Sequence, residues 1–179
     1  MTKSIRVRVV RAIAALFLGL MGSLWAANPA SAVANSYWVA TNTVNLGVCG
    51  PTGAAQTPGM YYQLCIRWLG NTVLKAPQWQ GYLVTTNTGV NRQYVHVNSA
   101  TLVGRKSVRP GELVDDFRDV GGCYTTAIYS RQSLTCRTSP AAFELFSRVY
   151  YQVRFEISGI SYYSYTFCEI TPPNNKCGR

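Results

Sequence analysis

Six cysteines are the residues of this chain whose number and spacing bear most directly on chemistry. No C-x-x-C pair occurs and His96 is the only histidine, so the usual ligand sets of a zinc site are missing. An even number of cysteines without such a set predicts disulfides, and we expect neither a metal nor a cofactor. Sequence alone leaves the connectivity open. Proximity along the chain favours three pairs: Cys49 with Cys65, Cys123 with Cys136, and Cys168 with Cys177.

Nucleophilic catalysis by a serine or a cysteine would need a histidine base. His96 lies in the extended segment Tyr94–Val97, where alternation places it on the face of Tyr94. No G-x-S-x-G sequence occurs, and the thiols already have a use as bridges. We therefore predict no catalytic residue of this kind and interpret His96 as a surface or structural side chain.

Acidic residues offer another route to catalysis, because glycoside hydrolysis requires two carboxyl groups about 5 to 10 Å apart across a cleft. Asp115, Asp116 and Asp119 are close in sequence. Three glutamates lie on other segments, at Glu144, Glu156 and Glu169. The ligand spacing of an EF-hand calcium loop is absent. A hydrolase that uses carboxylates from Glu112–Asp119 is one alternative function.

Aromatic side chains are the third group that could bind a ligand, and the chain has twelve tyrosines. The run Tyr162–Tyr165 places aromatic rings on both faces of one extended segment. Rings on an exposed face stack on sugars or anchor a protein partner, whereas rings on the other face fill a core. Our candidate binding residues are Trp79, Tyr162, Tyr163 and Tyr165.

The stretch Arg148–Cys168 must position most of these rings. Apolar residues occupy every second position from Tyr151 to Ile157, which predicts a half-buried strand. A second alternating run follows Ser158-Gly159, and glycine readily takes the positive φ of a tight turn. The two runs therefore predict an antiparallel hairpin.

Other segments repeat this pattern of short strands. We expect strands at Tyr37–Val44, Met60–Leu69, Gln78–Thr86 and Arg92–Val97, with a loop at Cys49–Gly59. Turn signals about every ten residues, without a long helical stretch, are typical of a sandwich or barrel. The predicted fold is all-β: a single antiparallel β-sandwich stapled by disulfides, immunoglobulin-like or related.

The polar segment Gly104–Gly122 allows two interpretations. Leu113, Phe117 and Val120 have helical spacing, which predicts a short helix. Alternatively, Pro110-Gly111 forms a type II turn between two edge strands, because proline presets φ before a glycine that can take positive φ. We favour the turn.

The N-terminus has the parts of a secretory signal peptide. A run that is almost entirely apolar, Ala12–Ala27, lies between basic residues and a small-residue cleavage site at Ala30–Ala34. The run is shorter than the roughly 20 residues of a membrane span. The basic residues are Lys3, Arg6, Arg8 and Arg11. We predict that residues 1–34 are cleaved, leaving 35–179 as one secreted, extracellular domain without a membrane span.

The charge of the chain argues against a nucleic-acid partner. Its formal net charge is +10, and four of the basic residues belong to the predicted leader. Apart from Arg105-Lys106, the other basic residues are scattered singly, whereas a nucleic-acid footprint clusters on one face. The sequence does not indicate an oligomeric state.

Two turn motifs carry a family resemblance. Asn87-Thr88-Gly89, followed after a strand by Val108–Glu112, resembles the middle of bacterial extracellular immunoglobulin-like sandwiches. The tyrosine corner of antibody-type domains is missing, because Leu134 and Thr166 stand two residues before Cys136 and Cys168. The resemblance implies a surface, adhesive or structural module without catalytic residues.

Three functions follow from these patterns. The first is a secreted, non-catalytic binding or structural module whose partner is an extracellular protein or a cell-wall glycan. The second is an inhibitor or toxin-like protein that presents the loop Cys123–Cys136, with Arg131 near its middle. The third is the carboxylate-dependent hydrolase. An exposed aromatic platform would favour the first function, a protruding loop the second, and facing carboxylates in a cleft the third.

Overall fold

The computed structural model describes residues 36–73, 76–143, 146–169 and 176–178. The predicted leader, 1–34, and Glu144 lie outside these residues, so both stay predictions. Ala34–Arg179 form one compact unit. Among the residues described, no helix has the length and apolarity to cross a membrane.

The described strands form two antiparallel sheets, as predicted for a β-sandwich. In sheet A the strand order is β1-β9-β5-β4-β2, with β3 beside β4 and β10 beside β5. Its strands are β1 (Tyr37–Ala40), β2 (Val48–Cys49), β3 (Gly53–Ala54), β4 (Met60–Asn71), β5 (Pro77–Asn87), β9 (Gln132–Arg137) and β10 (Ala141–Ala142).

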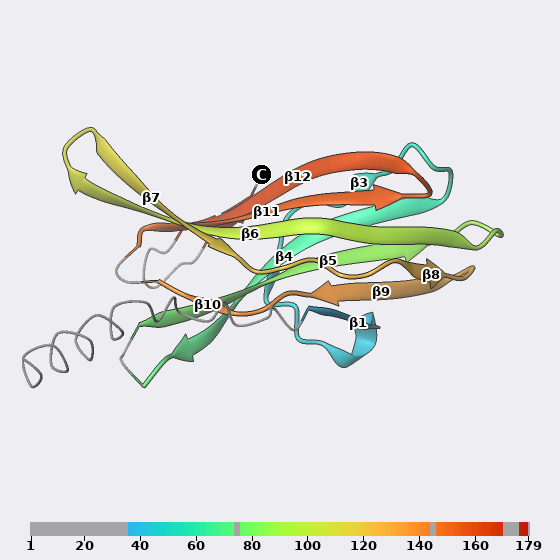
Figure 1. The fold of residues 1–179 in the computed structure, drawn as a ribbon, viewed down its shortest axis with the longest axis horizontal. Coiled ribbons are helices and arrows are strands. Elements are labelled where there is room, and N and C mark those ends of the chain that lie inside the picture. The colour runs from blue at the N-terminus through green and yellow to red at the C-terminus, as the bar shows by residue number, and fades with distance from the viewer. Residues whose placement is uncertain (1–35, 74–75, 144–145, 170–175, 179) are drawn as a thin grey trace, which may run out of the picture. The chain divides into compact units, whose positions relative to one another are not determined.

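Sheet B has the order β13-β12-β11-β6-β7, with β8 beside β6. Its strands are β6 (Gln93–Arg109), β7 (Glu112–Asp119), β8 (Thr126–Ile128), β11 (Arg148–Ile157), β12 (Ile160–Glu169) and β13 (Lys176–Gly178). Figure 1 shows β4 and β5 of sheet A passing behind the strands of sheet B. The sandwich therefore has one interior and two outer faces.

The predicted hairpin is β11 and β12, which pair from Arg148 opposite Glu169 to Ile157 opposite Ile160. Ser158 and Gly159 both have positive φ, 49° and 82°, as a two-residue hairpin turn requires. Buried residues alternate along β11, so its apolar positions face the interior.

The turn predicted at Pro110-Gly111 is confirmed, and the alternative helix is wrong. Gly111 has φ +83° and joins β6 to β7 in an antiparallel pair. The pairing of β6 with β11 ends at Arg105, which lies opposite Arg148. After Arg105, β6 pairs with β7 alone. The β6–β7 hairpin accordingly extends past the end of β11 in Figure 1. β6 was expected at an edge, but it lies between β11 and β7.

Two predicted boundaries near the N-terminus are wrong. The first strand ends at Ala40, because Thr41–Thr43 forms a 3-10 turn in which the Thr43 hydroxyl donates to the Ala40 carbonyl at 2.7 Å. The expected loop Cys49–Gly59 contains the short strand β3, which pairs with β4. Non-local pairing thus gives strand structure to a Gly- and Pro-rich segment.

Apolar side chains from both sheets fill the interior. Leu64, Ile66 and Leu83 come from sheet A, and the inward row of β11 comes from sheet B. The sheets approach closely at Gly81, where an added Cβ would lie 2.2 Å from the Tyr151 ring. Glycine is therefore needed in β5 to admit that ring.

Two predicted disulfides are present, Cys49–Cys65 and Cys123–Cys136. Cys168 is also disulfide-bonded, and the backbone of Cys177 lies opposite it in the register of β12 and β13. The first bridge fixes β2 on β4. The second closes a segment that passes from β8 in sheet B to β9 in sheet A.

The two outer faces differ in what covers them. On sheet A, Cys65, Tyr82 and Val84 form a second buried cluster beneath Val44 and Leu46. Aromatic residues are exposed on both sheets, Tyr37, Tyr61 and Trp68 on sheet A and Tyr163 and Tyr165 among those on sheet B. Only Tyr163 and Tyr165 come from the same face of one strand, so we take their surroundings on sheet B as the candidate site.

Candidate binding surface

The open face is the name we give to six outward residues on three neighbouring strands of sheet B. These residues are Ser99 and Thr101 of β6, Gln152 and Arg154 of β11, and Tyr163 and Tyr165 of β12. Each lies one or two positions from buried core residues, because side chains alternate along a strand. Core packing on the inner side thus presents them to solvent.

Strand register brings the six residues together in two rows. Arg154 lies between Ser99 and Tyr163, its Cα partners on the two neighbouring strands. Gln152 likewise lies between Thr101 and Tyr165. Adjacent strands lie roughly 4.8 Å apart, so each row of three residues spans roughly 10 Å, about the length of two sugar rings.

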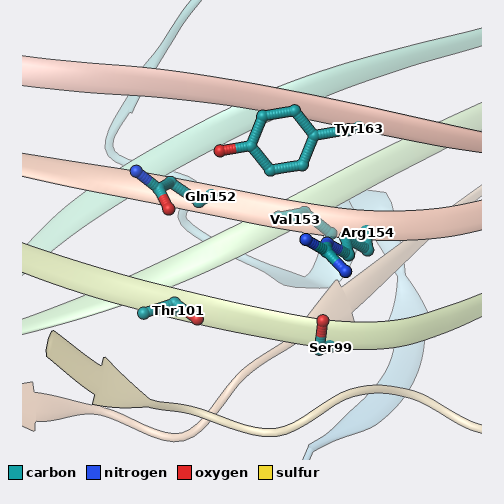
Figure 2. Close-up of a pocket in the computed structure, with 6 residues that line it drawn as sticks. All are labelled: Ser99, Thr101, Gln152, Val153, Arg154 and Tyr163. Atoms are coloured by element: carbon teal, nitrogen blue, oxygen red, sulfur yellow. The ribbon is translucent and has the colours of Figure 1, made fainter.

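Two shallow hollows lie on this face. One, of about 430 Å³, is lined by Ser99, Thr101, Gln152, Val153, Arg154 and Tyr163. The other, of about 480 Å³, shares Ser99, Arg154 and Tyr163 with the first and extends toward Ser161. In Figure 2 the sheet is viewed from outside, and the Tyr163 ring presents its flat side to the viewer. An aromatic platform with polar neighbours therefore borders open space.

A bulge in β6 shapes one end of the open face. The pairing of β6 with β11 shifts between Arg154 and Phe155, so that Asn98 has no Cα partner on β11. Asn98 and Ser99 are both exposed as a result. The Asn98 side-chain amide donates to Glu156 Oε1 at 3.1 Å. A residue of the bulge, Asn98, thus forms a hydrogen bond with Glu156, the acidic residue nearest to Arg154 along β11.

Other arginines of sheet B are paired with acids. Arg105 donates to both oxygens of Asp115, at 2.6 and 2.7 Å, and this contact lowers the pKa of the Asp115 carboxyl and raises that of the guanidinium. Arg148 donates to Glu169. In contrast, no carboxylate of the described residues forms an ion pair with Arg154.

The predicted binding residues do not share one surface. Tyr163 and Tyr165 are 58% and 47% exposed on the open face. Tyr162 faces the interior, where its ring stacks on Phe155 at 5.2 Å. The prediction that Trp79 binds a ligand is wrong. Only 5% of Trp79 is exposed and it belongs to the core, so it cannot contact a ligand at the surface.

Four residues of the open face were missed by sequence reasoning: Ser99, Thr101, Gln152 and Arg154. Alternation along β11 did place Gln152 and Arg154 on a polar side of the strand. Their proximity to residues of β6 depends on a register between strands about fifty residues apart, which no local pattern encodes.

The candidate catalytic groups are dispersed or already engaged. His96 is half-buried on the outer side of β6, and its Nδ1 lies 3.4 Å from the Thr125 hydroxyl. Asp116 is paired with Arg118, and Asp119 accepts from the Gly121 amide. Within the described ranges, no group of three or more His, Cys, Asp or Glu side chains could hold a metal ion.

The loop Cys123–Cys136 is a connection between the sheets. Both cysteines are buried, and β8 and β9 belong to different sheets. Its tip is a tight turn in which the Gln132 amide donates to the Tyr129 carbonyl at 3.1 Å and Arg131 has φ 59°. Arg131 therefore lies in a left-handed bend, not in an extended peptide that could add to a sheet edge of a target.

Comparisons with known proteins show no family for this chain. No protein-family model matches it, and no curated protein matches it. A solved structure titled as an X-ray structure of Northeast Structural Genomics Consortium target SoR45 is similar over 62% of this chain and 84% of that chain, with 10% identity and a TM-score of 0.40.

Proposed function

We propose that this protein is an exported, non-catalytic binding module and that the open face of sheet B binds a glycan. One observation carries the proposal: two exposed tyrosines on sheet B lie beside polar side chains that form no hydrogen bond within the described residues, whereas Val44 and Leu46 cover the centre of the outer side of sheet A. A tyrosine ring supplies flat apolar area, and its polar neighbours supply hydrogen bonds, the combination that sugars require.

The polar groups beside the tyrosines are free to bind. No hydrogen bond within the described residues engages the side chains of Ser99, Thr101, Gln152, Tyr163 or Tyr165. A sugar on the Tyr163 ring would have hydroxyl and amide groups of the neighbouring strands within reach. The β-sheet fixes the backbone of these residues, so binding orders their side chains but requires no ordering of the backbone.

The two alternative functions receive less support. A hydrolase would need free carboxyl groups facing each other across a cleft, but Asp115 and Asp116 are engaged by arginines. An inhibitor would need a presented segment, but the loop Cys123–Cys136 connects the two sheets and ends in a tight turn.

Retention of the oxidised protein 35–179 on insoluble polysaccharides and cell-wall preparations tests the proposal. Tyr163→Ala should reduce retention by about tenfold, the typical loss for an aromatic anchor. Tyr129→Ala is the matched control, because Tyr129 is 57% exposed but lies in the turn between β8 and β9. Equal retention of Tyr163→Ala and the unchanged protein, or no retention on any polysaccharide, would contradict the proposal.

A further inference from the structure

We infer that the glycan recognised by the open face carries an anionic group and that Arg154 binds this group. The inference rests on the proposed function and adds the charge of the ligand. Arg154 lies at the centre of the face, between Ser99 and Tyr163 in the strand register. Both hollows include these three residues. A saccharide in either hollow would therefore contact the guanidinium.

The guanidinium of Arg154 forms no ion pair with an acid of the described residues. Glu156, two residues along β11 on the same face, accepts a hydrogen bond from Asn98. Gln152, two residues in the other direction, is neutral. Among the described residues, Arg105 and Arg148 each have an acidic partner in sheet B, whereas Arg154 has none. An exposed arginine with open space on both sides favours an anionic ligand.

The neighbours of Arg154 support a defined contact. The guanidinium presents a planar fork of donors that fits a carboxylate or a phosphate through two parallel hydrogen bonds. The free hydroxyls of Ser99 and Thr101 can donate to the same anion or to sugar oxygens. The Tyr163 ring offers its flat side to the apolar side of a sugar (Figure 2). The anionic group, the sugar ring and its hydroxyls thus each have a counterpart.

The experiment measures affinity for three soluble polysaccharides: polygalacturonate as the carboxylated probe, a glycerol-phosphate polymer as the phosphorylated probe, and a neutral glucan. The expected result is a preference of at least about tenfold for one anionic probe over the neutral one, lost in Arg154→Gln. Whichever anionic probe shows the Arg154-dependent preference identifies the anion. Arg154→Lys should recover part of the affinity, because it keeps the charge but not the fork.

Arg131→Gln is the matched control, since Arg131 is exposed, lies off the open face and has no ion pair with a described acid. An equal loss in Arg131→Gln and Arg154→Gln would mean attraction by net charge and would overturn the inference. Neutral and anionic probes bound equally, with loss in Tyr163→Ala only, would overturn it and leave the proposed function intact. Binding to no probe would contradict both. Circular dichroism and thermal unfolding of each variant show whether the fold is retained.

Discussion

β5 and β11 hold the same place in their sheets, each with a neighbour on both sides, yet their burial differs. Nearly every residue of β5 from Trp79 to Asn87 is buried, on both faces of the strand. Along β11 buried and accessible residues alternate from Arg148 to Ile157. The difference arises outside the strands, because Val44 and Leu46 pack on the outer side of sheet A.

Hydroxyl groups show the same contrast. On sheet A, the Ser133 hydroxyl lies 2.9 Å from those of Thr41 and Thr86. On sheet B, the hydroxyls of Ser99 and Thr101 form no hydrogen bond within the described residues. A covered face satisfies its own polar groups, whereas an open face leaves them available to a ligand. We therefore expect substitutions on the covered part of sheet A to change stability, and substitutions on the open face of sheet B to change the proposed ligand binding.

The largest expected effect is a difference in stability between two variants, one with a tyrosine of sheet A truncated and one with a tyrosine of sheet B truncated. Tyr82 is fully buried beneath Val44 and Leu46, and its hydroxyl donates to Gln80 Oε1 at 2.7 Å. Tyr82→Ala should lower the free energy of unfolding by about 3 to 5 kcal/mol, the usual cost of removing a buried ring. Tyr163→Ala should change it by less than about 0.5 kcal/mol. Urea titration of both variants measures this; similar losses would abolish the contrast between the faces.

Removing the Cys49–Cys65 bridge should have the next largest effect. The bridge closes a loop with a sequence separation of 16 and ties the covering segment, residues 44–49, to β4. Replacing both cysteines by alanine should cost about 3 kcal/mol through loop entropy. Hydrogen exchange should also accelerate at amides of the segment that carries Val44 and Leu46. Unchanged exchange in this segment would show that packing alone holds the cover in place.

An added methyl group at the crossing of the central strands should cost less. Gly81→Ala places a Cβ against the Tyr151 ring, which is fully buried, and should lower the free energy of unfolding by roughly 1 to 3 kcal/mol. Ser99→Thr adds one carbon on the open face and should be nearly neutral. Thermal unfolding of the two variants compares them. A neutral Gly81→Ala would mean that the sheets can separate at this point without cost.

The smallest expected effect is a dependence of stability on pH from the Arg105–Asp115 pair. Arg105 lowers the pKa of Asp115 below its unfolded value near 4, so the pair stabilises the fold above about pH 4. That contribution is lost as the pH falls through the folded pKa. Since the pair is partly exposed, we expect at most about 1 kcal/mol. Asp115→Asn should flatten this acid limb in unfolding experiments, whereas Asp119→Asn should not.

Local patterns predicted the elements well. The β11–β12 hairpin follows from alternation and Ser158-Gly159, and the β6–β7 turn follows from Pro110-Gly111. Two disulfides follow from sequence proximity. These features depend on residues near each other in the chain, so one sequence contains the required information.

Long-range contacts explain what sequence reasoning missed. Alternation divides a strand into two faces but does not show which segment will cover each face, and this is why Trp79 was assigned to a surface. Alternation also does not show how the residues of neighbouring strands align, so the proximity of Arg154 to Ser99 could not be predicted. The open face combines three strands that meet only in the folded sheet.

Mapping the ligand contact by amide NMR tests directly whether a ligand binds to the open face of sheet B. A soluble fragment of a polysaccharide that retains the protein would be titrated into the isotope-labelled domain. We predict that the chemical-shift changes concentrate at Ser99, Thr101, Gln152, Arg154 and Tyr163. Residues of the covering segment, such as Val44 and Leu46, should change little. Shifts centred on sheet A or on the turn at Tyr129 would contradict the claim that the uncovered sheet is the binding face.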